Sequence, residues 1–366
     1  MGSNAVILVL GLVLIFGLIA GTLNNSSNET ITTTMGYYKY SQARNIAHSA
    51  VSLALRKIDD TNESNFFLSG NVDGGSYDLS CKDTLGGTYL KIRSDAIYND
   101  STYNIDVLFE RVAKDFPVPG AAVGFDFSPV DFSIKNVTNN KVKISGINHN
   151  YYWVNPTKLG VYDALGDSND VYAISVVAQS DSSNISSNYG AVLYPDTNKI
   201  TVTDTIPNYS TIVKEFIAMA DVKYVAIPPQ LNITSISPPA WGDSNKPKIV
   251  YIDATEAPVK ITGNVIGYGI LVVKGKLEVS GTLNFIGLVI PFNREFSDST
   301  VFDTPDSSTF SSTGTINIVG SVLMDGSPGS DFLLNGTANI YYSNDALKDA
   351  QQIGKLQYYK IVSWYE

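Results

Sequence analysis

The stretch MGSNAVILVLGLVLIFGLIAGTLNN, residues 1–25, decides the fold of this chain. Between Ala5 and Leu23 nothing is more polar than glycine and Thr22, and as a helix this run is long enough to cross a bilayer core of ~30 Å. An N-terminal anchor or signal peptide normally carries Lys or Arg on its cytoplasmic side. Here the first positive side chain is Lys39, beyond the apolar run. The segment is therefore predicted to span a membrane, and the charges that would orient it are absent.

The composition narrows the class of protein. The chain has 366 residues, 44% of them hydrophobic, and a net charge of -10, which is typical of an acidic globular protein. No block of clustered Lys and Arg occurs, so we expect no nucleic-acid partner. Cys81 is the single cysteine, and His48 and His149 are the two histidines, so neither an internal disulfide nor a His/Cys zinc cluster can form. We therefore expect no metal and no cofactor.

A second helical segment follows the apolar run. Residues 24–34 are rich in Asn, Ser and Thr, which are poor helix formers, so the helix is predicted to loosen there. From Tyr37 to Ile58 the helical pattern returns as one apolar stripe. The stripe consists of Ile46, Ala50, Leu53 and Ala54. The two segments together would form a rod of about 55 residues, roughly 80 Å long.

The next part of the chain has the two-residue period of β-strands. Between Tyr77 and Glu110 apolar residues alternate with polar ones in three runs, separated by Gly86-Gly87 and Asn99-Asp100 as turn signals. These runs predict an antiparallel meander that packs on the amphipathic half of the helix. DFPVPG, residues 115–120, then marks a boundary, because two prolines and a glycine end regular pairing.

The rest of the chain is predicted to be β-rich. Residues 121–246 show short β-like pieces and one helix at about Thr211 to Asp221. From Pro247 short strands are punctuated by regularly placed glycines, which predicts a β-solenoid, with a β-sandwich as the alternative. A short helix from Asn344 to Ile353, capped by Ser343 or Asn344, precedes a closing strand, YYKIVSWYE.

These elements predict an α+β protein. A long N-terminal hydrophobic and amphipathic α-helix is followed by a β-rich globular head, whose C-terminal part is β-solenoid-like. Four segments are expected: an assembly helix at 1–58, an antiparallel β meander packed on the helix at 59–116, an irregular β-rich insert domain at 117–246, and a β-solenoid-like domain at 247–366. A chain that starts near Asp59 is accordingly expected to be soluble, monomeric and β-rich.

The order of these parts resembles a known family. An uncharged hydrophobic helix that runs into an amphipathic one, followed by a β-rich head, resembles a type IV pilin with its leader removed. The C-terminal region is similar to the tails of bacterial pilus-assembly proteins of the PilX type. The segments that carry this second likeness are GYGILVVKGKLEVSGTLNFIGLVI, IYYSNDALKDA and KIVSWYE.

The resemblance explains the missing charge. Pilins are made with a basic leader that a prepilin peptidase removes, which would leave Met1 as a free, methylated N-terminus. The alternative is that Met1 is the initiator of a leaderless anchor. One departure from the family is Ala5, because the common pattern has a Glu at the fifth mature position that pairs with the amine of a neighbouring subunit.

The resemblance also implies a structural role rather than an enzyme. The chain would be a subunit of an extracellular helical filament on the cell surface, a homo-polymer built by pilus-assembly machinery from subunits held in the cytoplasmic membrane. The helix would polymerise through Met1, Ala5, Val9, Leu12, Phe16 and Ile19. Two alternatives stay open: a minor pilin that primes or tips a pilus made of another subunit, and a membrane-anchored surface adhesin or polysaccharide-active β-solenoid protein that contacts surface glycans.

Other side chains suggest chemistry only weakly. Two groups of aspartates, Asp163, Asp167 and Asp170, and Asp298, Asp303 and Asp306, are either solvated loops or Ca²⁺ ligands, and neither has the pattern of an EF-hand. The aromatic row Tyr151, Tyr152 and Trp153 belongs either to the core or to a sugar-binding surface. His149 has no obvious Ser or Cys partner in the sequence. None of these groups predicts an enzyme.

Asparagines form the remaining candidate sites. Asn-x-Ser/Thr triplets mark possible glycan acceptors on an exported surface. They begin at Asn24, Asn25, Asn28, Asn62, Asn99, Asn136, Asn184, Asn208, Asn232 and Asn335. We therefore expect a glycoprotein.

Overall fold

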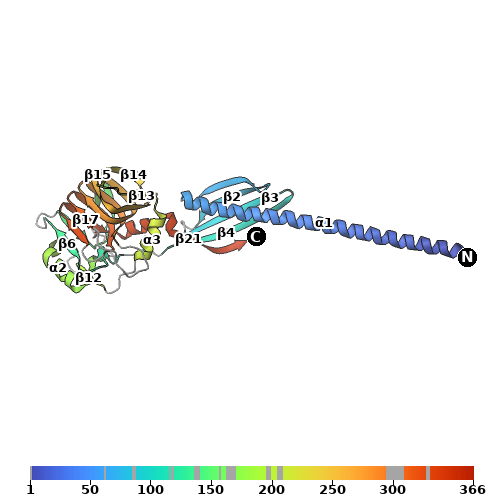
Figure 1. The fold of residues 1–366 in the computed structure, drawn as a ribbon, viewed down its shortest axis with the longest axis horizontal. Helices are drawn as coiled ribbons and strands as arrows, with labels where there is room; N and C mark the ends of the chain where they lie inside the picture. Colours follow the sequence, from blue (N-terminus) through green and yellow to red (C-terminus); the bar gives the residue numbers. More distant parts are fainter. Residues whose placement is uncertain are drawn as a thin grey trace. The chain divides into compact units, whose positions relative to one another are not determined.

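The structure of the chain is a computed structural model. The chain forms two compact units. The structure describes residues 2–61, 63–84, 88–114, 116, 119–135, 141–155, 158–161, 170–194, 199–203, 209–293, 309–326 and 330–366. Unit 1 consists of Met1–Val112 and Tyr358–Glu366, and unit 2 of Ala113–Gln357. The α+β class predicted from the sequence is confirmed, since a long helix precedes a region made mostly of strands (Figure 1).

Unit 1 begins with one unbroken helix. Helix α1 runs from Gly2 to Thr61, a length of 60 residues, so the loosening predicted at residues 24–34 is wrong. The hydroxyls of Thr30, Thr32 and Thr34 donate to backbone carbonyls four residues earlier, at 2.7–2.8 Å. Because these bonds stay within the helix, the polar side chains do not divert its backbone into a turn.

Four antiparallel strands follow α1 as a meander. They are β1 (Phe66–Val72), β2 (Gly75–Thr84), β3 (Tyr89–Tyr98) and β4 (Ser101–Ala113). The turn predicted at Asn99-Asp100 joins β3 to β4, with Asn99 at φ 54°. Gly86-Gly87 lies outside the described residues.

The meander covers one face of the second half of α1. The buried helix residues are Ala43, Ile46, Ala47, Ala50, Val51, Ala54 and Ile58. Leu53, which the sequence placed on this stripe, is 41% exposed, because the buried face follows the 43-46-50-54 spacing and Leu53 points away from it. Residues 43–58 are therefore part of the core of unit 1, and a chain starting near Asp59 would lack that part.

The closing strand of the chain also belongs to unit 1. Strand β21 (Gln357–Tyr365) lies beside β4, so the described strands of this sheet follow the order β1-β2-β3-β4-β21 (Figure 1). The sequence had grouped this strand with segment 247–366. Strands pair most often with the strand next to them in the sequence, but the pairing depends on how well the side chains fit in space, so a distant strand can also be the partner.

Unit 2 holds a larger sheet with parallel pairings. Its fourteen described strands are β5 (Ala121–Phe125), β6 (Asp131–Ile134), β7 (Val142–Ser145), β10 (Tyr172–Val176), β11 (Leu193–Tyr194), β12 (Ile200–Val202), β13 (Val222–Val225), β14 (Leu231–Trp241), β15 (Lys248–Val279), β16 (Thr282–Phe292), β17 (Thr309–Ser312), β18 (Thr315–Met324), β19 (Asp331–Leu334) and β20 (Thr337–Tyr342). Strands from 121–246 and from 247–356 thus share one sheet, where two separate segments were expected.

Smaller elements complete unit 2. A hairpin consists of β8 (Tyr151–Asn155) and β9 (Lys158–Val161), and the helices are α2 (Gln179–Tyr189), α3 (Tyr209–Met219), α4 (Asn344–Gln351) and the 3-10 turns η2 (Gly190–Val192) and η3 (Gly354–Leu356). Helices α3 and α4 are the two that the sequence predicted, and Ser343 Oγ caps α4 by accepting from the Ala346 N–H at 3.3 Å. Helix α2 has no apolar stripe and was not predicted.

Equivalent positions on neighbouring strands stack in register. Gly269, Gly287 and Gly320 are paired across β15, β16 and β18, each with a positive φ. A Cβ on Gly287 would lie 2.0 Å from the Gly269 carbonyl oxygen, so only glycine fits. The sheet curls as a half-barrel, and its closure into a solenoid stays a prediction.

Side chains stack along the same direction. Asn264, Asn284, Asn317 and Asn339 form a ladder of amide hydrogen bonds of 3.5, 2.8 and 2.9 Å. On the inner side the rings of Phe132, Phe332 and Phe310 lie nearly parallel, with centroids 5.3–5.5 Å apart. Such ladders hold the strand register, since a slip would break every step at once.

Candidate assembly helix

The first half of α1 exposes apolar side chains on all sides. Of the residues predicted to assemble, Val9 is 58% exposed, Leu12 45%, Phe16 66% and Ile19 47%. The side chains of Met1 and Ala5 lie outside the described residues. The exposed large apolar residues of this half are Val9, Leu10, Leu12, Val13, Leu14, Ile15, Phe16, Leu18, Ile19 and Leu23. Because consecutive positions such as 14, 15 and 16 point in different directions around a helix, no side of it is polar.

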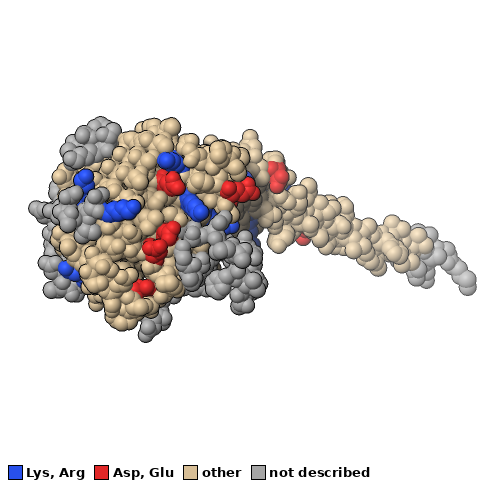
Figure 2. Space-filling model, turned by 60° about the vertical axis from the view of Figure 1, so that its left-hand side comes forward, with Lys and Arg blue, Asp and Glu red and all other residues tan. Residues whose placement is uncertain are grey.

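This segment also fits a bilayer. In the described part of the chain, α1 is the one helix long and apolar enough to cross a membrane. Figure 2 shows the described part of its free length as almost uniformly uncharged. The predicted membrane-spanning segment is therefore a helix whose whole circumference needs either lipid or other helices.

The exposed half ends where α1 meets its own sheet. Lys39 Nζ donates to Asp100 Oδ1 at 2.7 Å, and the Tyr38 ring meets Tyr98 edge-on at 6.2 Å. Residues 12–38 are all exposed. From Val9 to Tyr38 the free helix is about 45 Å long at the α-helical rise.

Three glycines lie on the exposed half. A Cβ placed on Gly11, Gly17 or Gly21 would have nothing within 4 Å. The surface at these positions is therefore open in the single chain, as close approach of another helix requires. Their role in packing stays a prediction, because glycines are also tolerated in membrane helices.

The candidate calcium groups are only partly described. Asp163, Asp167, Asp298, Asp303 and Asp306 lie outside the described residues. Asp170 Oδ1 accepts a hydrogen bond from the Asn148 N–H at 2.8 Å, so it supports a loop. Among the described residues there is no group of three or more His, Cys, Asp or Glu side chains that would hold a metal ion.

The aromatic row packs on unit 2. Tyr151 and Trp153 are half-buried in a cluster that covers β15, β16 and β18, and Trp153 Nε1 donates to the Tyr268 hydroxyl at 2.6 Å. Burial raises the pKa of Tyr151 to about 12. Tyr152 is exposed. Tyr151 and Trp153 therefore pack against the core, which was one of the two alternatives left open by the sequence.

His149 has a serine neighbour that sequence reasoning missed. Its Nε2 lies 3.1 Å from Ser145 Oγ, on the residue that ends β7. Both residues are buried, and the Tyr341 ring packs edge-on against the imidazole at 5.0 Å. A nucleophile must be accessible to its substrate, so this pair is a hydrogen bond within the core.

The candidate glycan acceptors differ in accessibility. Six are exposed: Asn24, Asn25, Asn28, Asn99, Asn184 and Asn232. Asn335 is half-buried beside the corner between β19 and β20. Asn62, Asn136 and Asn208 lie outside the described residues.

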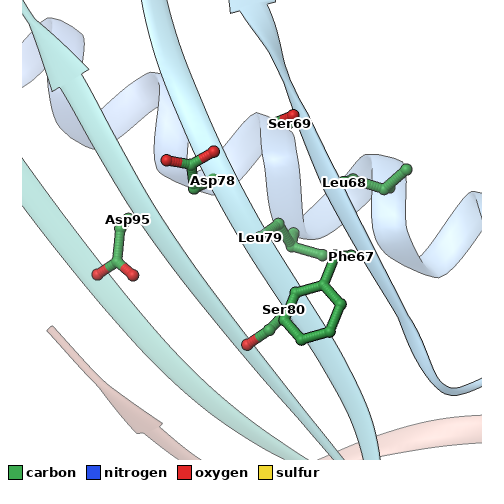
Figure 3. Close-up of a pocket in the computed structure, with 7 residues that line it drawn as sticks. All are labelled: Phe67, Leu68, Ser69, Asp78, Leu79, Ser80 and Asp95. Carbon is green, nitrogen blue, oxygen red and sulfur yellow. The ribbon is translucent and has the colours of Figure 1, made fainter.

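Unit 1 also has a groove on its sheet (Figure 3). It encloses about 380 Å³ and is lined by Phe67, Leu68, Ser69, Asp78, Leu79, Ser80 and Asp95. Asp78 and Asp95 are direct cross-strand partners on β2 and β3, and Arg93 donates to Asp95 at 3.3 Å. The groove is open and of mixed polarity, with the carboxylates of Asp78 and Asp95 beside the apolar side chains of Phe67, Leu68 and Leu79.

Comparison with known proteins gives little support for a family. No protein-family model matches the chain. No curated protein matches it either. Among solved structures, the crystal structure of the competence-associated pilin ComZ from Thermus thermophilus aligns with 90% of this chain and 96% of that chain, at 10% identity and a TM-score of 0.22. At this TM-score the likeness supports no conclusion about fold or function.

Proposed function

We propose that this chain is a structural subunit of an extracellular, pilus-like helical filament that polymerises through the first half of α1. The observation that carries the proposal is that the two halves of one continuous helix differ in burial. Residues 43–58 pack one face on the chain's own sheet, whereas the large apolar side chains from Val9 to Leu23 point to every side of the helix and stay largely uncovered by the described part of the chain. A bundle of identical helices outside the membrane would cover them.

The energetic gain from such a bundle is large enough to drive assembly. The ten large apolar side chains of this half are 45–69% exposed. At ~1.5–3 kcal/mol for full burial of each side chain, covering the remaining half gives on the order of 10 kcal/mol per helix. Ordering costs are subtracted from this sum, and lipid provides a similar gain in the membrane. The membrane-held chain and the filament subunit are thus close in free energy, which suits polymerisation by assembly machinery.

The finer parts of the proposal follow from the same helix. Ala5 cannot form the carboxylate pair of the common pilin pattern, so subunit order in the bundle would depend on packing. The exposed asparagines beyond α1, Asn99, Asn184 and Asn232, would carry glycans on the outside of the polymer. A leader removed by a prepilin peptidase, homo-polymerisation and a cell-surface location are all included in this proposal.

The experiment compares two forms of the chain. The full chain is purified in detergent, the detergent is removed, and the product is examined by negative-stain electron microscopy. A variant that lacks residues 1–35 keeps Lys39 and the buried helix residues from Ala43 onward, so unit 1 should fold and the variant should stay monomeric.

The possible results separate the proposal from its main rival. Filaments from the full chain alone support it. A full chain that stays as single molecules in lipid vesicles points instead to a membrane-anchored surface protein. Filaments of equal yield from the shortened variant would refute a helical core.

A further inference from the structure

The last strand of the chain returns to its first unit. Strand β4 ends at Ala113 and β21 begins at Gln357, and the whole of unit 2 lies between them in the sequence. Within unit 1, β21 lies next to β4 as the fifth described strand (Figure 1). Until β21 has been synthesised, β4 would therefore be an edge strand with unpaired backbone groups.

The end of β21 also contacts α1. The Trp364 ring stacks on the imidazole of His48, with centroids 5.1 Å apart and 19° between the planes. One turn earlier on the helix, Arg44 Nη2 donates to Glu366 Oε2 at 2.8 Å. Positions 44 and 48 lie on the same side of a helix, so the end of the strand lies along that side.

Glu366 joins three elements through one carboxylate. Its Oε2 accepts from Arg44 of α1 and from the Tyr103 hydroxyl of β4 at 2.6 Å. Its Oε1 accepts from Trp364 Nε1 at 2.8 Å and lies 3.2 Å from His48 Nε2. Hydrogen bonds to a charged group are stronger than neutral ones, and three donors on one carboxylate, from Arg44, Tyr103 and Trp364, form a geometrically restrictive contact.

The charge state of this group is well defined. The Tyr103 hydrogen bond, followed by that of Trp364, lowers the pKa of Glu366 to about 2. Burial, followed by the hydrogen bond to Glu366, raises the pKa of Tyr103 to about 12. The ring of Tyr40 also packs edge-on against Tyr103 at 5.1 Å. Near neutral pH the carboxylate is therefore ionised and the phenol is neutral, as these hydrogen bonds require.

We propose that β21 is a strap that fastens α1 to the sheet of unit 1, and that it closes only after unit 2 has been synthesised. The apolar face of α1 packs on β2 and β3, and β21 holds the side that carries Arg44 and His48. A chain that has not reached Glu366 would present a loosely held helix. The strap concerns the docking of α1 within one chain, so it is independent of whether the helix polymerises or stays in a membrane.

The experiment measures hydrogen exchange by mass spectrometry on the full chain in detergent. Two variants release the strap: Glu366→Gln, which keeps the shape of the side chain but removes its charge, and Trp364→Ala, which removes the stack. The control is Val362→Thr, at an exposed position of the same strand. Loss of one hydrogen bond to the charged carboxylate is expected to increase the local opening of α1 by about tenfold or more.

The expected result is at least about tenfold faster exchange in residues 40–54 for both strap variants. Exchange in β1 to β3 and in unit 2 should stay as in the unchanged chain, and the control should match it throughout. Unchanged exchange in residues 40–54 would overturn the proposal. Equal acceleration in β1 to β3 would overturn it too, because β21 would then be a general part of the core.

Discussion

Replacing Leu12 with aspartate would place a carboxylate in the exposed apolar half of every α1 helix. Leu12 is 45% exposed, and the apolar residues around it leave no polar side of the helix to which the carboxylate can turn. In a bundle the change would recur at every subunit, so like charges would repeat along the axis. In a bilayer a single chain carries one such group, which can be protonated or drawn toward water.

The two environments differ in what the change costs. On insertion scales an Asp at the centre of a membrane helix costs ~2.5–3.5 kcal/mol. In a bundle the variant loses the free energy of burying the exposed part of the Leu12 side chain, about 1 kcal/mol. Desolvation of the new carboxylate costs several kcal/mol more. A total of about 5 kcal/mol per subunit would raise the concentration needed for polymerisation by more than about a thousandfold. Polymerisation should therefore fail while membrane insertion persists.

The assay measures both states in the same preparation. Filament yield is measured by sedimentation and electron microscopy, and insertion by flotation with vesicles. The matched control is Thr33→Asp, on the same helix at an exposed position in its polar segment, and it should form filaments at normal yield. Leu12→Asp filaments of normal length and yield would show that these helices are not the core of the polymer.

Three further predictions concern stability. Gly287→Ala should destabilise unit 2 by about 3 kcal/mol or more in chemical unfolding, because φ is 127° and the new methyl group would lie 2.0 Å from a carbonyl oxygen, whereas Gly190→Ala, with open space around its Cβ, should leave stability unchanged. Asn317→Leu should cost about 2 kcal/mol in the same measurement, since it removes two ladder hydrogen bonds of 2.8 and 2.9 Å. The hydrogen bonds to Glu366, that of Tyr103 first, lower its pKa from 4.5 to about 2. The contribution of the ionised Glu366 carboxylate to the stability of unit 1 is therefore complete above pH 4.5 and is lost as the pH falls toward 2. Glu366→Gln should remove this pH dependence, and an unchanged acid transition would contradict the assignment.

Local sequence patterns predicted much of the fold. The apolar run to Leu23 predicted a helix long enough to span a membrane, and the two-residue alternation after Tyr77 predicted the antiparallel meander. Residues 344–351 and the region of α3 were recognised as helices from their caps and apolar spacing. These patterns succeed because burial of one face imposes a period of 3.6 or 2 residues on the chain itself. The candidate assembly site was predictable for the same reason, since it is a property of one continuous segment.

The tertiary structure decided which segments pair. It joined residues 121–246 and 247–356 into one sheet, returned β21 to the first unit, and brought Ser145 to His149. It also showed that Leu53 faces away from the sheet and that the second half of α1 belongs to a core. A periodic pattern predicts that one face of a segment is buried, but it does not indicate which other segment covers that face. Partners are selected by shape and hydrogen-bonding fit between segments that are distant in sequence, as between β4 and β21, and that fit exists only once the chain has folded.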